Sequence, residues 1–314
     1  MGGLWRFLFK IPPDETTLKK RGFRATTDTA RHRLEQIGAT FVAGYHAALE
    51  EKRPESLRAR LEQTVELEQQ GFAFEGAAMA LTLLDLLLPG RRGRLNAFLA
   101  GPADHHAYMV HIGAGWALAR LRRRAEPILQ KLDPLICWLA LDGYGFHEGY
   151  FHSDRSVEAQ EVPSRLQGYA RRVFDQGLGR SLWFVEGADV RAVKARVGSF
   201  AAERQADLWS GVGLAACYAG GVATTALQTL QEEAGEFRPH VAQGAAFAAK
   251  AREKAGTSTE QTETACRILC RLPAAEAVRW TDAAMEDLPQ QGPAEAEPAF
   301  EVWRARLRER FAEG

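Results

Sequence analysis

The sequence of 314 residues carries no surplus of charge: Lys and Arg together number 40, and Asp and Glu together number 40. Proteins whose main partner is nucleic acid usually carry a basic surplus, so this balance argues against that class of partner. No run of about 18 apolar residues occurs, which argues against a membrane-spanning helix. No secretory signal is recognisable at the N-terminus, and we therefore expect a cytoplasmic protein.

Cysteine is scarce as well. The chain has four, Cys137, Cys217, Cys266 and Cys270. A protein without a secretory signal is expected to meet a reducing cytosol, which argues against a disulfide framework. We therefore expect these cysteines to be free thiols packed in the core.

The alternation of Val, Ile and Thr that marks β-strands is nearly absent. Leu and Ala instead recur at helical spacing through most of the chain, and Pro and Gly residues mark where the helical stretches end. The predicted helical stretches are 30–50, 55–68, 74–88, 108–124, 164–176, 189–197, 201–218, 223–234, 240–254, 260–271 and 299–312. The sequence therefore predicts an all-α fold.

An internal repeat is visible at a nearly constant offset. Residues 111–119 match residues 240–248 at an offset of 129, and residues 74–80 match residues 209–215 at an offset of 135. Such regularity indicates a duplication, with two units packed about a pseudo-twofold axis. The predicted organisation is an N-terminal segment 1–24, helical unit 25–141, connecting segment 142–163, helical unit 164–285, and a linker with a C-terminal helix, 286–314.

The connecting segment 142–163 breaks the helical pattern. Three glycines within residues 143–149 make a regular helix costly, so we expect an irregular, glycine-rich structure here. Aromatic and titratable side chains lie among these glycines, and glycine lets a ligand approach the backbone closely. This segment is therefore the candidate site.

Three interpretations of the segment remain open. One is a metal site formed by His147, Glu148 and His152. Histidines five residues apart diverge by about 140° on a helix, so only a loop would bring this pair together. The second interpretation is acid–base catalysis or substrate binding by Tyr144, His147 and Glu148. The third is structural, with the aromatic rings filling the junction and the polar groups bonding locally.

Further candidates are predicted to bind a ligand. A second glycine-rich stretch, 175–187, contains Arg180 and Ser181, which suit a carboxylate or phosphate group. Gly and Ala side chains on one face of a helix allow another helix or a ligand to approach the backbone closely. A cleft between the two units would therefore suit a slim apolar molecule. The predicted ligand-binding residues are Trp116, Phe146, Tyr150, Arg180, Ser181, Trp183 and Trp209.

Several unusual strings match a known family. They are IPPDE (11–15), RGF (21–23), FEGAAMA (74–80), MVHIGAGW (109–116), LDGYGFHEGYF (141–151), QGLGRSLW (176–183), DLWSGVG (207–213) and QGAAF (243–247). Through them the chain, from about residue 10 to residue 285, resembles a bacterial family of unknown function encoded in enediyne polyketide gene clusters, sometimes labelled UnbL-type. The resemblance implies a role in bacterial secondary metabolism. It supplies neither a reaction nor catalytic residues.

Three functions follow from these observations as hypotheses. The first hypothesis is an enzyme that acts on a long, apolar, unsaturated polyketide intermediate. The second is a carrier that binds the intermediate without changing it. The third hypothesis is a scaffold that docks on the polyketide synthase, contacts other enediyne-pathway proteins or forms a homo-oligomer. The sequence identifies no cofactor.

Overall fold

The computed structural model describes residues 9–24, 27–88, 93–289 and 297–313, and it confirms the all-α fold, with no strand among these residues. The α-helices are α2 (Leu18–Arg21), α3 (Asp28–Glu50), α4 (Pro54–Thr64), α5 (Gln70–Leu87), α6 (Arg94–Leu99), α7 (Ala107–Arg120), α8 (Glu126–Leu129), α9 (Leu139–Phe151), α10 (Tyr169–Val185), α11 (Val190–Gly198), α12 (Ala202–Tyr218), α13 (Thr224–Glu233), α14 (Arg238–Ala255), α15 (Glu260–Leu269), α16 (Ala274–Ala283) and α17 (Ala299–Glu313). Short 3₁₀ helices are η1 (Pro13–Thr16), η2 (Leu67–Gln69), η3 (Asp104–His106), η4 (Ile136–Trp138) and η6 (Gly235–Phe237), and η5 (Asp154–Glu158) is a π-helix.

Local sequence sets several helix ends. The hydroxyl of Thr27 accepts a hydrogen bond from the backbone N–H of Ala30 and caps α3, and the carboxylate of Asp189 caps α11 in the same way. Gly256 ends α14 in the left-handed conformation, with φ of 66°. These signals explain why the predicted stretches agree with the observed helices at many of their ends.

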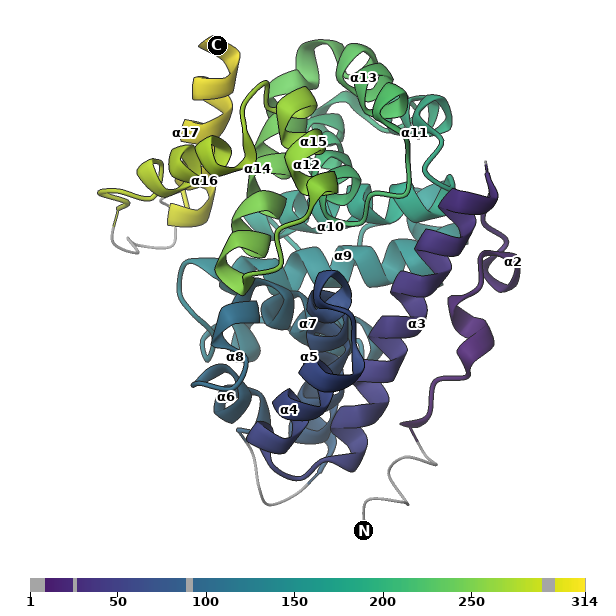
Figure 1. Cartoon of the computed structure of the whole chain (residues 1–314), viewed down its shortest axis with the longest axis vertical. Helices are drawn as coiled ribbons and strands as arrows, with labels where there is room; N and C mark the ends of the chain where they lie inside the picture. The colour runs from purple at the N-terminus through teal and green to yellow at the C-terminus, as the bar shows by residue number, and fades with distance from the viewer. Residues whose placement is uncertain (1–8, 25–26, 89–92, 290–296, 314) are drawn as a thin grey trace.

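Seven helices form the centre of the molecule, and each packs against the next: α3, α5, α7, α9, α10, α12 and α14. Figure 1 shows α9 and α10 lying across the middle, with α5 and α7 on one side and α12 and α14 on the other. The shorter helices connect these seven or cover their outer faces. The centre is thus a series of neighbouring helices in chain order.

Glycines set how closely these helices pack. A Cβ atom on Gly177 of α10 would lie 1.8 Å from the carbonyl oxygen of Asp142 in α9. One on Gly179 would lie 2.0 Å from the carbonyl oxygen of Leu208 in α12. Real Cβ atoms do not approach oxygen so closely, so only glycine permits these crossings. The first glycine contacts the preceding helix and the second contacts the following one.

The same arrangement recurs through the centre, and we call these residues the glycine ladder. In every case a Cβ would lie 1.8–2.1 Å from a neighbouring carbonyl oxygen. The glycines that contact the preceding helix recur every 30 to 37 residues. They are Gly76, Gly113, Gly143, Gly177, Gly211 and Gly244, and those that contact the following helix are Gly44, Gly115, Gly145, Gly179 and Gly213.

The ladder corrects one expectation from the sequence. Residues 142–151 are not irregular but belong to the buried helix α9, and the glycine-rich stretch 175–187 is helical up to Val185. Glycine disfavours an isolated helix, but here its missing side chain lets neighbouring helices pack backbone to backbone. The glycine ladder, in which the glycines that contact the preceding helix recur every 30 to 37 residues, includes Gly113, Gly115 and Gly244 of the matched stretches 111–119 and 240–248. The larger two-unit symmetry and its domain bounds stay a prediction.

One helix of the core is long and apolar, although the sequence argued against a membrane-spanning helix. The stretch Leu67–Leu87, which contains α5, is long and apolar enough to cross a membrane by length and composition. However, 83% of its most apolar 18-residue window is buried inside the protein. It is therefore the kind of core helix that a soluble protein also contains.

Candidate functional site

A cavity lies at the centre of the helix series, and we call it the central cavity. Its wall comes from α3, α5, α7, α9, α10 and α12, and residues 11–16 of the N-terminal segment complete it. Its atom-free space is about 770 Å³, a figure that includes solvent at its mouth. Only about 60 Å³ of this is open to the centres of water-sized molecules, so the cavity is narrow.

Aromatic rings form much of the wall. The Trp116 indole lies 4.3 Å from the ring of Phe41 and 5.1 Å from that of Phe146, centroid to centroid. The ring of Phe184 meets Phe146 edge-on at 5.2 Å. Such a wall favours an apolar ligand with extended π-electrons, because aromatic pairs gain from offset and edge-on contacts.

Three charged residues interrupt this apolar lining: the buried Glu75 and Arg180, and the partly buried Glu15, which pairs with Arg21. Glu75 on α5 is 2% exposed and Arg180 on α10 is 5% exposed, and both line the cavity. The indole Nε1–H of Trp116 donates to Glu75 Oε1 at 2.9 Å, while Arg180 Nη2 lies 3.8 Å from the same oxygen. Arg180 Nη1 donates to Asp142, which is fully buried behind the cavity wall. Two carboxyl groups therefore share one guanidinium.

This arrangement shifts the ionisation of Glu75. Burial raises its pKa from 4.5 to about 7, against the lowering effects of Arg180 and of the Trp116 hydrogen bond, and Asp142 raises it further. A carboxyl group with a pKa near neutrality can both give and take a proton at working pH. Glu75 is thus the candidate acid–base group of the cavity.

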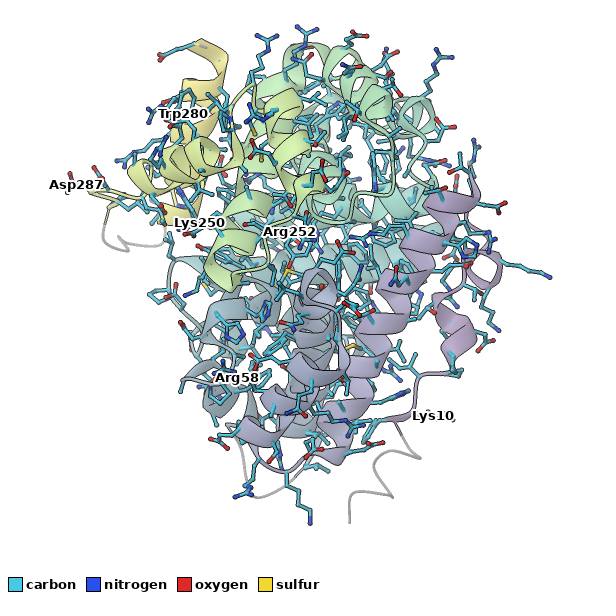
Figure 2. The ribbon with its side chains drawn as sticks, in the orientation of Figure 1. Lys10, Arg58, Lys250, Arg252, Trp280 and Asp287 are labelled. Carbon is cyan, nitrogen blue, oxygen red and sulfur yellow. The ribbon has the colours of Figure 1, made fainter. Side chains whose placement is uncertain are left out.

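One hydroxyl group of the cavity lining, that of Tyr218, has no hydrogen bond of its own among the described residues. Tyr218 belongs to α12, and its hydroxyl is buried. Arg252 of α14 fixes this tyrosine, because its guanidinium donates to the Tyr218 carbonyl oxygen at 2.7 Å and lies 4.1 Å from the ring centroid. Figure 2 labels Arg252 near the middle of the molecule. A buried hydroxyl without a partner is suited to bind a ligand oxygen.

Behind the cavity, polar side chains continue through the core. Asp142 accepts from Gln176 Nε2 at 2.8 Å. Ser210 Oγ lies 3.4 Å from Gln176 Oε1 and donates to Gln243 Oε1 at 2.8 Å. With Glu75, these residues each directly precede a ladder glycine, so the close helix packing places them in one row. Their mutual bonds satisfy part of the polar groups that burial would otherwise leave costly, although Gln243 Nε2 has no partner among the described residues.

The structure brings together part of the predicted ligand-binding set. Trp116, Phe146, Tyr150 and Arg180 all line the central cavity, whereas Ser181, Trp183 and Trp209 do not. The Ser181 hydroxyl donates to the carbonyl oxygen of Leu178, and the Trp183 indole donates to that of Gly220. Trp209 is buried in α12. These three are placed as core residues of α10 and α12.

The predicted catalytic residues lie on α9 outside the cavity lining. His147 Nδ1 lies 3.2 Å from Glu148 Oε1. Burial lowers the pKa of His147, although Glu148 opposes this. Despite burial, the pKa of Glu148 is lowered by its bond to His147. The Tyr144 hydroxyl accepts hydrogen bonds from Arg165, and burial raises its pKa. Their catalytic role stays a prediction.

The N-terminal segment closes one side of the cavity. The hydroxyl of Tyr150 donates to the carbonyl oxygen of Thr16 at 3.4 Å, and the ring of Phe23 meets Tyr150 edge-on at 5.2 Å. The Arg21 guanidinium lies 5.1 Å from the ring centroid of Phe151. Ile11, Glu15 and Thr16 of the predicted segment 1–24 therefore belong to the cavity wall, while residues 1–8 lie outside the described residues.

Sequence reasoning missed Glu75 and Tyr218. Glu75 occurs in an otherwise apolar string, residues 72–81, and a lone charge in a buried helix was the available signal. Tyr218 gave no such signal, because a tyrosine at a helix end is ordinary and its missing partner is visible only in three dimensions.

The fold and this site define a class: an all-helical protein whose central helices enclose a narrow apolar cavity with a buried carboxyl group. The chain belongs to a protein family of unknown function, DUF1702, which it matches over residues 1–311. Comparisons with curated proteins and with solved structures found no match.

Proposed function

We propose that this protein binds a long, slender, unsaturated molecule in the central cavity and transfers a proton to or from it through Glu75. The observation that carries the proposal is a deeply buried carboxyl group, Glu75, with a raised pKa in an apolar, aromatic cavity. The ligand's apolar body lies against Trp116 and Phe146. An oxygen at its polar end takes the Tyr218 hydroxyl and Arg180 as donors.

The resemblance to enediyne-cluster proteins supplies the biological setting of the proposal. In that setting the ligand is a long unsaturated polyketide intermediate, and the protein is a cytoplasmic accessory of the pathway. An apolar polyene fits a wall of stacked aromatic rings better than a sugar or a nucleotide does, because those ligands need many more polar partners. Other proteins of the pathway, including the polyketide synthase, are its proposed partners.

Carriage without chemistry is the second candidate, favoured by the narrow, apolar character of the cavity. It needs the same binding but not the ionisable carboxyl group. Glu75→Gln separates the two candidates, because the amide keeps an oxygen acceptor for Trp116 while it removes the proton-transfer group.

The test begins with binding of cis-parinaric acid, a fluorescent conjugated tetraene with a terminal carboxylate. We expect saturable binding, weakened about tenfold by Tyr218→Phe through the loss of one ligand hydrogen bond. Tyr108→Phe, a partly buried tyrosine outside the central cavity, is the matched control and leaves binding unchanged. Absence of saturable binding to the parent protein refutes the proposal.

Product formation in a reconstituted pathway then decides between catalysis and carriage. Glu75→Gln that binds the tetraene but forms no product supports proton transfer. Full product formation by the same variant supports carriage.

A further inference from the structure

A second cluster of chemically active side chains lies at the end of α9. The helix ends at Phe151, and His152 adopts φ of −132° and ψ of 46°, which is not helical. Its side chain therefore does not continue along the helix surface. As a result, one ligand atom each from His147, Glu148 and His152 lies within 4.8 Å of the other two. The divergence expected of histidines five residues apart is removed because α9 stops before the second one.

The donor atoms are close to the spacing that a metal ion requires. Ligands about 2.1 Å from a tetrahedral ion lie about 3.4 Å from one another. His147 Nδ1 and Glu148 Oε1 are already 3.2 Å apart. His152 is nearby, with 5.9 Å between the two imidazole ring centroids. Because these donor atoms lie within 4.8 Å of one another, they need to approach by at most about 1.4 Å to reach this spacing.

The surroundings hold two of these ligands in place. The side chains of His147 and Glu148 are 6% and 12% exposed. The ring of Phe151 lies 5.0 Å from the His147 ring, and Trp116 meets it edge-on at 5.8 Å. Rigid neighbours of this kind fix the orientation of an imidazole and reduce the entropy lost on metal binding.

We propose that His147, Glu148 and His152 bind one divalent transition-metal ion of the Zn²⁺ or Fe²⁺ class. Two imidazole nitrogens and one carboxylate oxygen are the donor set that such ions take in sites with three protein ligands. Three ligands leave at least one coordination position for water or another molecule. The site is separate from the central cavity, but Trp116 and Phe151 belong to both, so the ion lies behind the aromatic wall.

The test uses the metal alone. The full-length protein is treated with a chelator, dialysed and titrated with Co²⁺ and Zn²⁺, and the Co²⁺ absorption spectrum and the metal content per chain are measured. We expect one ion per chain, with affinity lowered at least about tenfold in Glu148→Gln and His152→Ala. His152 is partly exposed at the helix end, so this variant is expected to fold. His32→Ala, an exposed histidine on α3, is the matched control and keeps the parent affinity.

Two results overturn the proposal: a parent protein that binds less than one ion per chain, or ligand variants that fold and bind as tightly as His32→Ala. Binding of cis-parinaric acid is measured in parallel. Ligand variants that lose the metal but bind the tetraene as tightly as the parent protein show that the metal site and the central cavity bind independently.

Discussion

The ionisation of Glu75 gives the sharpest prediction for the central cavity. The folded protein holds the proton on this carboxyl group more tightly than the unfolded chain does, because its pKa rises from 4.5 to about 7. Its contribution to folding stability is therefore complete below about pH 4.5 and is lost as the pH rises through about 7. One pKa unit corresponds to about 1.4 kcal/mol, so the whole loss is about 3 kcal/mol.

Glu75→Gln removes this dependence. The amide stays neutral at every pH and retains an oxygen for the Trp116 indole, so the variant keeps the geometry of the protonated parent. Between pH 5 and pH 8 the parent should lose about 2–3 kcal/mol of unfolding free energy relative to the variant. Subtraction of the two profiles cancels every other titrating group that the substitution leaves unchanged.

The assay is urea unfolding of both proteins at half-unit steps from pH 5 to pH 8, followed by circular dichroism. Infrared difference spectra supply a second readout, since the carbonyl band of a protonated carboxyl group should disappear from the parent near pH 7 and be absent from the variant. Parallel stability profiles would refute the reasoning, because they would mean that Glu75 ionises in the fold as it does in the unfolded chain.

Two further predictions concern the glycine ladder and the buried polar row. Gly177→Ala places a Cβ 1.8 Å from the Asp142 carbonyl oxygen and should lower the free energy of unfolding, measured in urea, by more than about 3 kcal/mol. The control is Gly198→Ala, whose Cβ would meet nothing within 4 Å and should stabilise α11 by up to about 1 kcal/mol. Equal effects of the two substitutions would contradict the role given to the glycine ladder. Ser210→Ala removes the 2.8 Å bond to Gln243 and should cost about 1–3 kcal/mol, measured in the same way.

The fold class was predictable because it depends on local periodicity. Leu and Ala at helical spacing, with scarce strand patterns, indicated an all-α protein, and the structure agrees. The error in 142–151 shows the limit of this reasoning. Gly143 and Gly145 disfavour a helix when each residue is judged alone. In the fold, carbonyl oxygens of α7 and α10 occupy the space that a side chain at these two positions would fill, so glycine is required within the helix. A single sequence does not show those neighbouring helices.

The site was predictable only where a signal lay in the sequence itself. Of the aromatic residues predicted to bind a ligand, Trp116, Phe146 and Tyr150 line the central cavity, whereas Trp183 and Trp209 do not. The role of these residues in binding stays a prediction. Two polar contributors to the cavity, Glu75 and Tyr218, depend on distant partners. The raised pKa of Glu75 comes from its burial and from Asp142 on another helix, which no local pattern shows.

The glycine ladder also explains why Glu75 is the polar row's carboxyl group at the cavity. The residue before the glycine that contacts the preceding helix is polar in α5, α9, α10, α12 and α14. In α7 this residue is Ile112. The row is therefore interrupted between Glu75 and Asp142. Asp142 has Gln176 and Arg180 as partners behind the wall, while Glu75 meets only an indole N–H and the far side of the same guanidinium. Of the two carboxyl groups in the polar row, Glu75 is therefore the one that the fold neutralises less.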